Sequence, residues 1–174
     1  TLISFDFNRE PLTCIIAQKP EFNKLHVIEE IVDNIDIEEM CNMILIKYPN
    51  ALFLITGDQT GEHASAIQKG LTHYRKIKEV LSLSEGQVRL PGKNPLHRIS
   101  RMEVNTLLSR TEIIFDEVNC KQAIWDCKNV EYDPEKLKII KEDRSKMEQQ
   151  SDLLDCFRYL IHNFMRDELK HLGL

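Results

Sequence analysis

The feature that most constrains the fold of this chain is its opening, where three short apolar runs follow one another with tight connections. ISFDF (3–7) alternates between apolar and polar residues, which is the period-two pattern of a β-strand. LTCIIAQ (12–18) follows Pro11, and LHVIEEI (25–31) follows a second turn-rich connection. Strands this short and this closely joined predict an antiparallel meander.

A capped helix and a strongly apolar strand come next. Asp36 has the position of an N-cap with Glu39 three residues later, as in a capping box, and helical spacing continues up to Pro49. ALFLITGD (51–58) is apolar almost without interruption up to Asp58, which is typical of a strand buried on both faces in a parallel arrangement. A helix that joins the third strand to this one is a crossover, so we expect a mixed sheet.

Helices dominate the rest of the chain. The stretch 131–150 is highly charged and poor in apolar residues, and we expect a mobile segment there. The sequence has no internal repeat, so residues 1–174 are predicted as one α/β domain, with three antiparallel strands plus parallel strands flanked by helices. The remaining helices are expected at about 64–83, 98–109, 119–128 and 151–169, and short strands at 87–90 and 111–117.

The composition is that of an ordinary globular domain, with 42% apolar and 29% charged residues, which argues against a disordered chain. No apolar run approaches the ~20 residues of a membrane span, and the N-terminus lacks the pattern of a secretory signal. The cysteines are odd in number and form no CxxC pair, which favours reduced thiols over a disulfide framework or a zinc site.

The net charge of −5 argues, taken whole, against a nucleic-acid-binding protein, but the charge is unevenly spread. Residues 1–58 hold 10 acidic and 4 basic residues, whereas 63–81 and 89–110 are basic. An acidic centre beside basic stretches suits a metal-dependent enzyme that acts on a polyanion, although a basic helix face is as often merely solvated. The candidate DNA contacts are Lys69, Arg75, Lys76, Arg89, Lys93, Arg98 and Arg101.

Three aspartates could carry chemistry. Asp6 lies on the polar side of the first strand, Asp58 ends a buried strand, and Asp155 lies near the start of the last helix. Ligands of α/β sheets gather at the carboxyl ends of strands, so Asp6 and Asp58 would approach each other if their strands are neighbours. Asp152 shares nearly the same helical face as Asp155. Taken singly, such residues are more often solvated side chains, turn formers or helix caps.

Carboxylates that meet repel one another, and a divalent cation relieves this repulsion. Ligand sets made only of oxygen suit Mg²⁺ or Mn²⁺. Two such ions about 3.5–4 Å apart can activate a water molecule and stabilise the leaving oxygen of a phosphodiester. If the three aspartates meet, they therefore predict a two-metal phosphodiesterase site.

Four motifs in order resemble the C-terminal nuclease domain of the large terminase subunit of tailed bacteriophages. They are FDFNREP (5–11), LITGDQTGEHAS (54–65), RISRMEVNTLLS (98–109) and SDLLDCFRYLI (151–161). The resemblance covers nearly the whole chain, and the expected order of strands and helices is that of the RNase H fold. This family implies an RNase H-like domain in which a mixed sheet carries the metal-binding acids.

The resemblance implies an endonuclease that cuts double-stranded DNA concatemers during viral genome packaging. Asp6, Asp58 and Asp155 would match the family's catalytic, metal-binding acids, and Asp152 is a further candidate ligand. In the family an ATPase domain precedes the nuclease; because no GxxxxGK[ST] loop occurs here, we expect the nuclease part of a longer protein. The expected partners are DNA, that ATPase domain, the small subunit and the portal, in the host cytoplasm and without a membrane; the isolated domain is expected to be monomeric.

Two alternatives stay open. Another RNase H-like nuclease, such as a junction resolvase or a hybrid nuclease, would prefer a different substrate. A docking module with this fold and no catalysis would have no acid cluster. There are four further candidates. His63 could contact DNA or a metal-bound water, and Asn94 could enter a groove of the DNA. Lys141 and Arg144 could clamp the duplex, although residues of these types are often ordinary polar surface residues.

Overall fold

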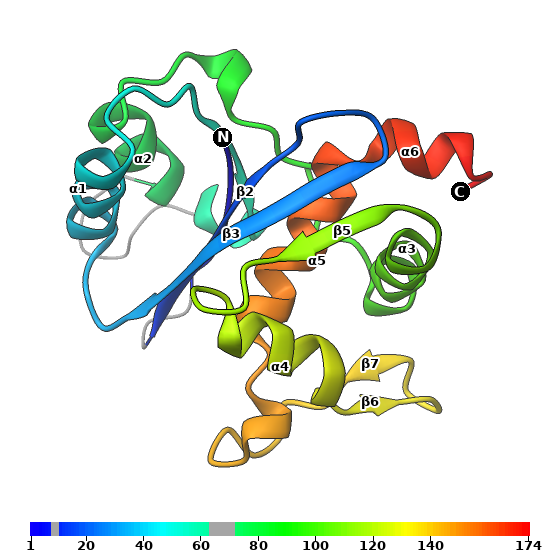
Figure 1. Ribbon diagram of the computed structural model, residues 1–174. Helices are drawn as coiled ribbons and strands as arrows, with labels where there is room; N and C mark the ends of the chain where they lie inside the picture. The colour runs from blue at the N-terminus through cyan, green and yellow to red at the C-terminus, as the bar shows by residue number, and fades with distance from the viewer. Residues whose placement is uncertain (8–10, 63–71) are drawn as a thin grey trace.

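The computed structural model describes residues 1–7, 11–62 and 72–174. They form a five-stranded mixed sheet in the order β4-β1-β2-β3-β5, with helices on both faces (Figure 1). A separate two-stranded hairpin, β6-β7, projects beside α4. The predicted mixed sheet flanked by helices is therefore confirmed.

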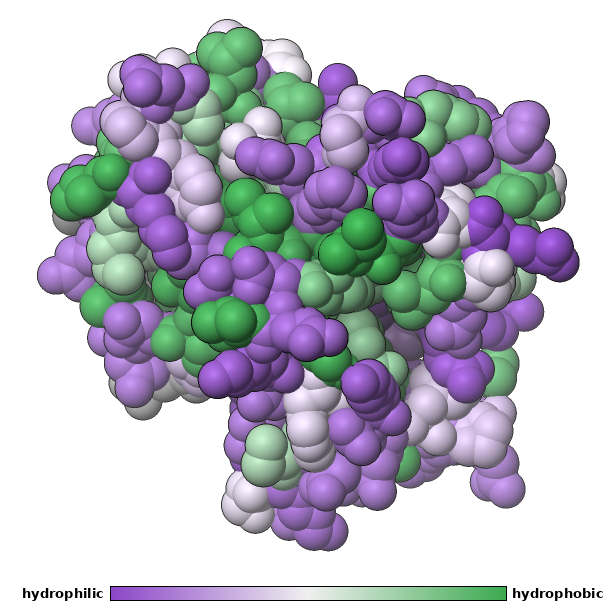
Figure 2. Space-filling model, viewed as in Figure 1, coloured by the Kyte–Doolittle hydropathy of each residue, from purple (hydrophilic) through white to green (hydrophobic). Residues whose placement is uncertain are grey.

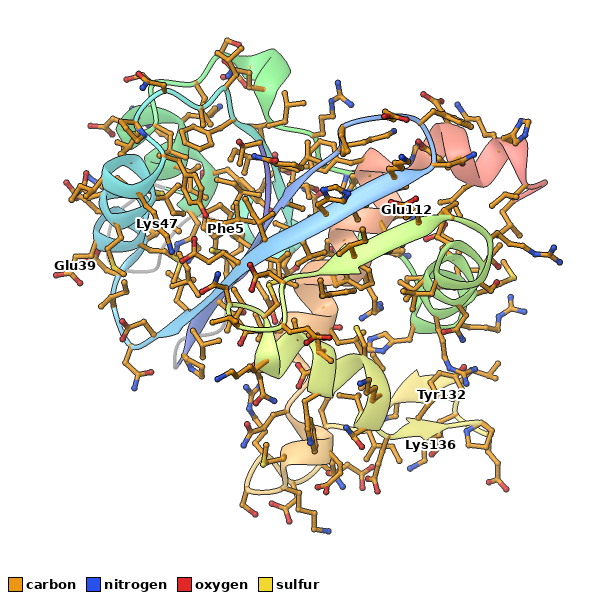
Figure 3. The ribbon with its side chains drawn as sticks, in the orientation of Figure 1. Phe5, Glu39, Lys47, Glu112, Tyr132 and Lys136 are labelled. Atoms are coloured by element: carbon orange, nitrogen blue, oxygen red, sulfur yellow. The ribbon has the colours of Figure 1, made fainter. Side chains whose placement is uncertain are left out.

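The predicted meander is also confirmed. β1 (Leu2–Asp6), β2 (Leu12–Gln18) and β3 (Lys24–Asp33) pair antiparallel in chain order. α1 (Ile37–Lys47) begins at the predicted capping box, in which the Asp36 carboxylate accepts from Glu39 N at 2.9 Å (Figure 3 labels Glu39). This helix crosses over to β4 (Leu54–Gly57), which pairs parallel with β1, and β5 (Glu112–Phe115) pairs parallel with β3 at the opposite edge.

The predicted helix over 64–83 and strand over 87–90 need correction. The described helix in the first region, α2, spans only His73–Val80. Thr72 is extended and its hydroxyl accepts from Arg75 N at 3.1 Å, so this N-cap starts a new helix and one continuous helix is excluded. The earlier part of the predicted helix lies outside the described residues. Around Val88 a single bridge to Ile55 replaces the predicted strand, because the preceding residues wind into a 3₁₀ turn at Glu85–Gln87.

The second half of the chain is helical, as expected. α3 (His97–Arg110), α4 (Lys121–Asn129) and the last helical region match the predicted positions. The last region is two helices, α5 (Asp152–Phe164) and α6 (Arg166–His171), because Met165 leaves the helical conformation at φ −111°. The predicted single helix over 151–169 is wrong at this residue.

The charged stretch 131–150 is folded, in contrast to the mobile segment expected there. Tyr132–Asp133 (β6) and Lys138–Ile139 (β7) pair as a hairpin, and Met147–Gln149 form a 3₁₀ turn. Ile139 and Gln149 are buried, and the Gln149 amide accepts from Asp143 N at 2.7 Å. A few buried anchors thus order a stretch whose average composition is polar.

The core lies in two layers, one on each side of the sheet. α1 and α2 cover one face with the cluster that contains Ile3 and Phe5, and α3, α4 and α5 cover the other with the cluster that contains Phe157. α5 lies across β1, β2 and β4 and is buried on nearly all sides. All five cysteines are free, as predicted, and no described helix is long and apolar enough to cross a membrane.

On the side of the sheet that faces the viewer in Figure 1, no described helix covers the part of β3 and β5 that lies away from α1. The space-filling view in Figure 2 shows apolar side chains reaching the surface over this part of the sheet. Ile114 of β5 is 48% exposed, and Val118, just after the strand, is 74% exposed. This surface is on the side of the sheet away from α5.

Candidate functional site

The carboxyl ends of β1 and β4 bring Asp6 and Asp58 together. The two strands are parallel neighbours, with Phe5 opposite Gly57. Asp58 N then donates to Phe5 O at 2.9 Å, so both chains leave the sheet at the same end. The condition on which the sequence prediction rested, that the two strands are neighbours, is confirmed.

Gly57 makes this close approach possible. A Cβ atom at this position would lie 2.2 Å from the carbonyl oxygen and 2.8 Å from the backbone nitrogen of Phe5, and the residue has φ +150°. Both the contact and the backbone conformation therefore require glycine. Gly57 thus allows β4 to approach β1 closely, and Asp58 follows it directly at the strand end.

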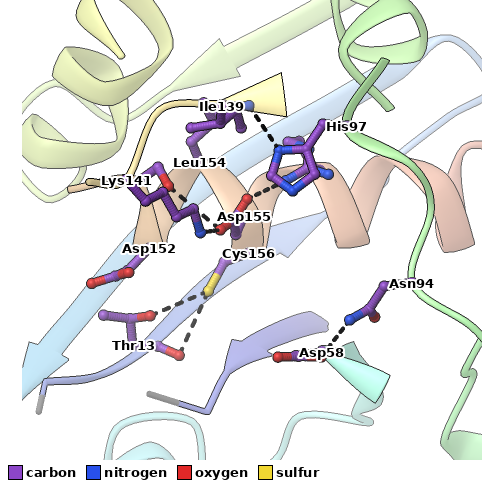
Figure 4. A network of polar contacts seen from close by, with 12 residues as sticks. Thr13, Asp58, Asn94, His97, Ile139, Lys141, Asp152, Leu154, Asp155 and Cys156 are labelled. Atoms are coloured by element: carbon purple, nitrogen blue, oxygen red, sulfur yellow. Dashed lines mark hydrogen bonds and ion pairs between the residues drawn. The ribbon is translucent and has the colours of Figure 1, made fainter. Parts of the chain in front are cut away.

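α5 adds two more acids from across the strand ends. Asp152 and Asp155 occupy its first turn, and both are buried although they are charged residues. Burial raises the pKa of the Asp6 carboxyl well above its usual 3.8; the negative charge of Asp155 raises it further, Lys141 lowers it, and Asp152 and Asp58 raise it. The four carboxylates thus share one electrostatic environment, which we call the acid cluster (Figure 4 shows three of its members).

Three basic side chains accompany the acid cluster. Asp155 forms ion pairs with Lys141 and Arg158, and Asp152 forms one with Arg144. Arg158 is buried, and its Nε donates to Ser100 Oγ at 2.7 Å. Lys141 and Arg144 come from the stretch after β7, so the segment first interpreted as a possible DNA clamp contacts the acids of α5 instead.

Asp58 is oriented by neutral groups. Its Oδ1 accepts from Asn94 Nδ2 at 2.6 Å and from Thr60 N at 2.9 Å, and its Oδ2 accepts from Thr60 Oγ1 at 2.7 Å. The Asn94 Oδ1 in turn accepts from Gln59 N at 2.9 Å (Figure 4 labels Asn94 beside Asp58). Asn94, considered from the sequence as a groove-reading residue, therefore holds the carboxylate in position.

The donor set fits a hard divalent cation by its chemistry. Every side chain offered by Asp6, Asp58, Asp152 and Asp155 is a carboxylate, and these four acids outnumber the three basic partners named above. Within residues 1–7, 11–62 and 72–174, no three His, Cys, Asp or Glu side chains already lie in an arrangement that could hold a metal ion. Carboxylate oxygens of Asp155 and Asp152 contact basic side chains of the protein instead.

The predicted DNA contacts separate into two groups. Lys93 and Arg98 are exposed; Lys93 directly precedes Asn94, which donates to Asp58, and Arg98 lies in the first turn of α3. Arg101 lies one turn further along α3 and stacks on the Tyr132 ring, with its guanidinium carbon 4.3 Å from the ring centre (Figure 3 labels Tyr132). These three lie on the α3 side of the acid cluster.

The other candidates lie elsewhere. Lys76 forms a 2.6 Å ion pair with Glu38 of α1, and Arg75 is an exposed residue of the same helix α2. Arg89 lies over the Phe164 ring and lines a cavity with Thr1, at the end of β1 opposite to Asp6. Lys69 and His63 lie outside the described residues.

Asp126 of α4 was not found by the sequence reasoning. It is buried, which raises its pKa from 3.8 to about 7, although hydrogen bonds from Gln122 and from Leu154 N lower it. It lines a cavity of about 280 Å³ together with Asp152 and Arg144. No spacing in the sequence marks this residue, because its burial depends on the packing of α4 on α5.

Comparison with known proteins gives two solved structures of the same fold. No protein-family model and no curated protein matches the sequence. The nuclease domain of the large terminase g2p from bacteriophage SPP1, with bound Mn, is 18% identical with a TM-score of 0.54, over 95% of this chain and 84% of that one. This chain has the fold of a phage large terminase nuclease domain. The P22 large terminase nuclease domain agrees, with a TM-score of 0.58, 18% identity and the same coverage.

The fold expected from the four motifs is thereby confirmed as RNase H-like in the form that terminase nucleases use. At this level of identity, likeness establishes the fold, and what the chain does has to be argued from its own side chains.

Proposed function

We propose that this chain is a divalent-metal-dependent endonuclease that cuts double-stranded DNA concatemers during viral genome packaging, as the nuclease part of a large terminase. The observation that carries the proposal is the convergence of Asp6, Asp58 and Asp155 at one end of the sheet. Burying carboxylates that repel one another costs stability, and a docking module would gain nothing from it. Support also comes from the two structures of this fold, both large terminase nuclease domains, one with bound Mn.

In this proposal Asp6, Asp58 and Asp155 would hold two Mg²⁺ or Mn²⁺ ions, with Asp152 as a fourth ligand. Such ions supply an activated water and stabilise the leaving oxygen of a phosphodiester. The chain's own residues prepare the site: Asn94 and Thr60 orient the Asp58 carboxylate, and the Asp58 carbonyl accepts from Tyr74 Oη at 3.0 Å. Rigid ligands of this kind lower the cost of organising the site.

DNA phosphates would bind along the α3 side of the acid cluster, where Lys93, Arg98 and Arg101 lie. Arg75 of α2 stays a candidate DNA contact, and Lys69 stays a prediction outside the described residues. Lys76 pairs with Glu38, and Arg89 lies over the Phe164 ring. We propose further that the domain is monomeric by itself and works in the host cytoplasm with an ATPase domain, a small terminase subunit and a portal.

Plasmid cleavage tests the proposal. We expect nicking and linearisation with Mg²⁺ or Mn²⁺, none with EDTA, and a loss of about a thousandfold or more for Asp58→Asn, because one metal ligand is removed. Asp167→Asn, which changes an exposed acid of α6, is the matched control and should cleave like the unchanged protein. Absence of metal-dependent cleavage, or full activity in Asp58→Asn, would reject the proposed site.

Substrate competition separates this proposal from the other RNase H-like nucleases. Linear duplex, a four-way junction and an RNA–DNA hybrid of equal length would be compared at equal concentration. We expect the plain duplex to be cut at least as fast as the other two. A strong preference for the junction or for the hybrid would move the chain to a resolvase or a hybrid nuclease.

A further inference from the structure

Both carboxylate oxygens of Asp155 contact basic side chains. Arg158 donates to Oδ1, and Lys141 donates to Oδ2 (Figure 4 labels Lys141 and Asp155). Ser151 Oγ lies 3.5 Å from the same Oδ2. A metal ion that bound Asp155 would therefore compete with a basic side chain at each of its two carboxylate oxygens.

The two cations differ in how firmly they are held. Arg158 belongs to α5 itself, its side chain is 3% exposed, and Ser100 fixes its Nε. Lys141 follows β7, and its side chain is 34% exposed. The partly exposed Lys141 ammonium, at the end of a flexible side chain, can be rehydrated easily. The buried Arg158 guanidinium, which is bound to both Asp155 and Ser100, cannot. Lys141 is thus the cation that can leave.

Lys141 also acts on more than one acid. Its positive charge opposes the effect of Asp155 on Asp6, so it compensates charge at both carboxylates at once. Compensation of several neighbouring carboxylates is what a divalent cation does in such a site. Arg144, the other basic residue of the same segment, pairs with Asp152 instead.

We propose that Lys141 is the internal counter-ion of the acid cluster, and that a divalent ion binds only when the Lys141 ammonium leaves Asp155 Oδ2. This inference rests on the proposed function, since it concerns the metal of that site. Lys141 then holds the acids together without metal and weakens the affinity for metal. In this role Lys141 sets the metal affinity of the acid cluster and needs no contact with DNA.

Calorimetric titration with Mn²⁺ alone tests this, without DNA. Lys141→Met should bind Mn²⁺ about tenfold more tightly than the unchanged protein, a change of ~1.4 kcal/mol, because the competing charge is gone. In EDTA its melting temperature should fall, since the four acids lose a counter-ion. Lys138→Met, which removes an exposed charge from β7 of the same hairpin, should change neither quantity.

Lys141→Arg retains the charge and should bind Mn²⁺ no more tightly than the unchanged protein. This variant keeps the test decisive if Lys141→Met does not fold. Equal or weaker binding by Lys141→Met, or tighter binding by Lys141→Arg, would overturn the role of Lys141 while leaving the nuclease proposal intact. Absence of Mn²⁺ binding in every protein would reject the metal site of the proposed function and the role of Lys141 with it.

Discussion

The two faces of the sheet are made by the same strands, yet their chemistry differs. Toward α1 and α2 the strands present apolar side chains, which pack against Met40 and Ile44. Toward α5 the strand ends present buried polar side chains, and α5 faces them with charged residues. The apolar set is Ile3, Phe5, Cys14 and Ile16, and the polar set is Ser4, Asp6, Thr13 and Thr56.

The two faces differ in how their buried groups contribute to stability. Apolar burial stabilises the α1 side by about 25 cal/mol for each Å² removed from water. On the α5 side each buried polar group needs a partner: Thr56 Oγ1 accepts from Asn163 at 2.7 Å, and Thr13 Oγ1 lies 3.5 Å from Cys156 Sγ. Ser4 Oγ has no hydrogen-bond partner among the described residues, and burial together with the negative charge of Asp155 raises the pKa of Asp6. The α5 side of the sheet therefore combines an apolar core with buried polar groups, whereas the core of the α1 side is apolar.

The largest expected effect is at Asp6. Asp6→Asn should lower cleavage by about a thousandfold or more and should raise the stability of the metal-free protein at neutral pH. The raised pKa means that ionising Asp6 in the folded state costs stability as the pH climbs above the usual value of 3.8. Urea unfolding in EDTA, beside plasmid cleavage, measures both. A lower free energy of unfolding for Asp6→Asn than for the unchanged protein would contradict the stability cost expected for the buried Asp6 carboxylate.

The next effect concerns the opposite face. Met40 of α1 is fully buried, so Met40→Ala should cost about 2–5 kcal/mol in the free energy of unfolding. Cleavage per folded molecule should stay unchanged, because this residue lies across the sheet from the acids. Ile46→Ala on the same helix is the control; Ile46 is 82% exposed, and the change should stay within about 0.5 kcal/mol.

A smaller effect depends on pH. Because the folded pKa of Asp126 is about 7, above the usual 3.8, its contribution to stability is complete at low pH and is lost as the pH rises through 7. Asp126→Asn should remove this slope and be more stable than the unchanged protein at pH 8, by up to about 4 kcal/mol for the shift from 3.8 to about 7. Urea unfolding across that pH range measures it, and an identical slope in both proteins would contradict the assignment.

The smallest effect is in DNA binding. Arg101→Ala should lower the slope of log affinity against log salt concentration by about one, since one phosphate contact is lost. Arg89→Ala, at the far end of β1, should leave the slope unchanged for a duplex that covers only the acid cluster. Fluorescence anisotropy in EDTA measures both without cleavage. Equal losses would mean that the DNA runs along the whole sheet.

Much of the architecture could be predicted from local patterns. β2 has the predicted bounds, Leu12–Gln18, and α1 begins at the predicted capping box, because alternation and capping act over a few residues. The order of the segment 131–150 could not be predicted, since it depends in part on long-range contacts such as the hydrogen bond from Ile139 N to His97 Nδ1 at 3.1 Å. The break at Met165 likewise has no local signal such as proline or glycine.

The five strands of the main sheet, the crossover helix and the three aspartates that could bind a metal were all predictable from the sequence. The tertiary structure was needed to show that β1 and β4 pair, that Arg158 and Lys141 form ion pairs with Asp155, that Asn94 orients Asp58, and that Arg89 lies at the opposite end of β1 from Asp6. The cause is the distance along the chain over which each kind of interaction acts. Periodicity and capping are written in neighbouring residues, whereas charge compensation joins side chains that meet only after the chain has folded.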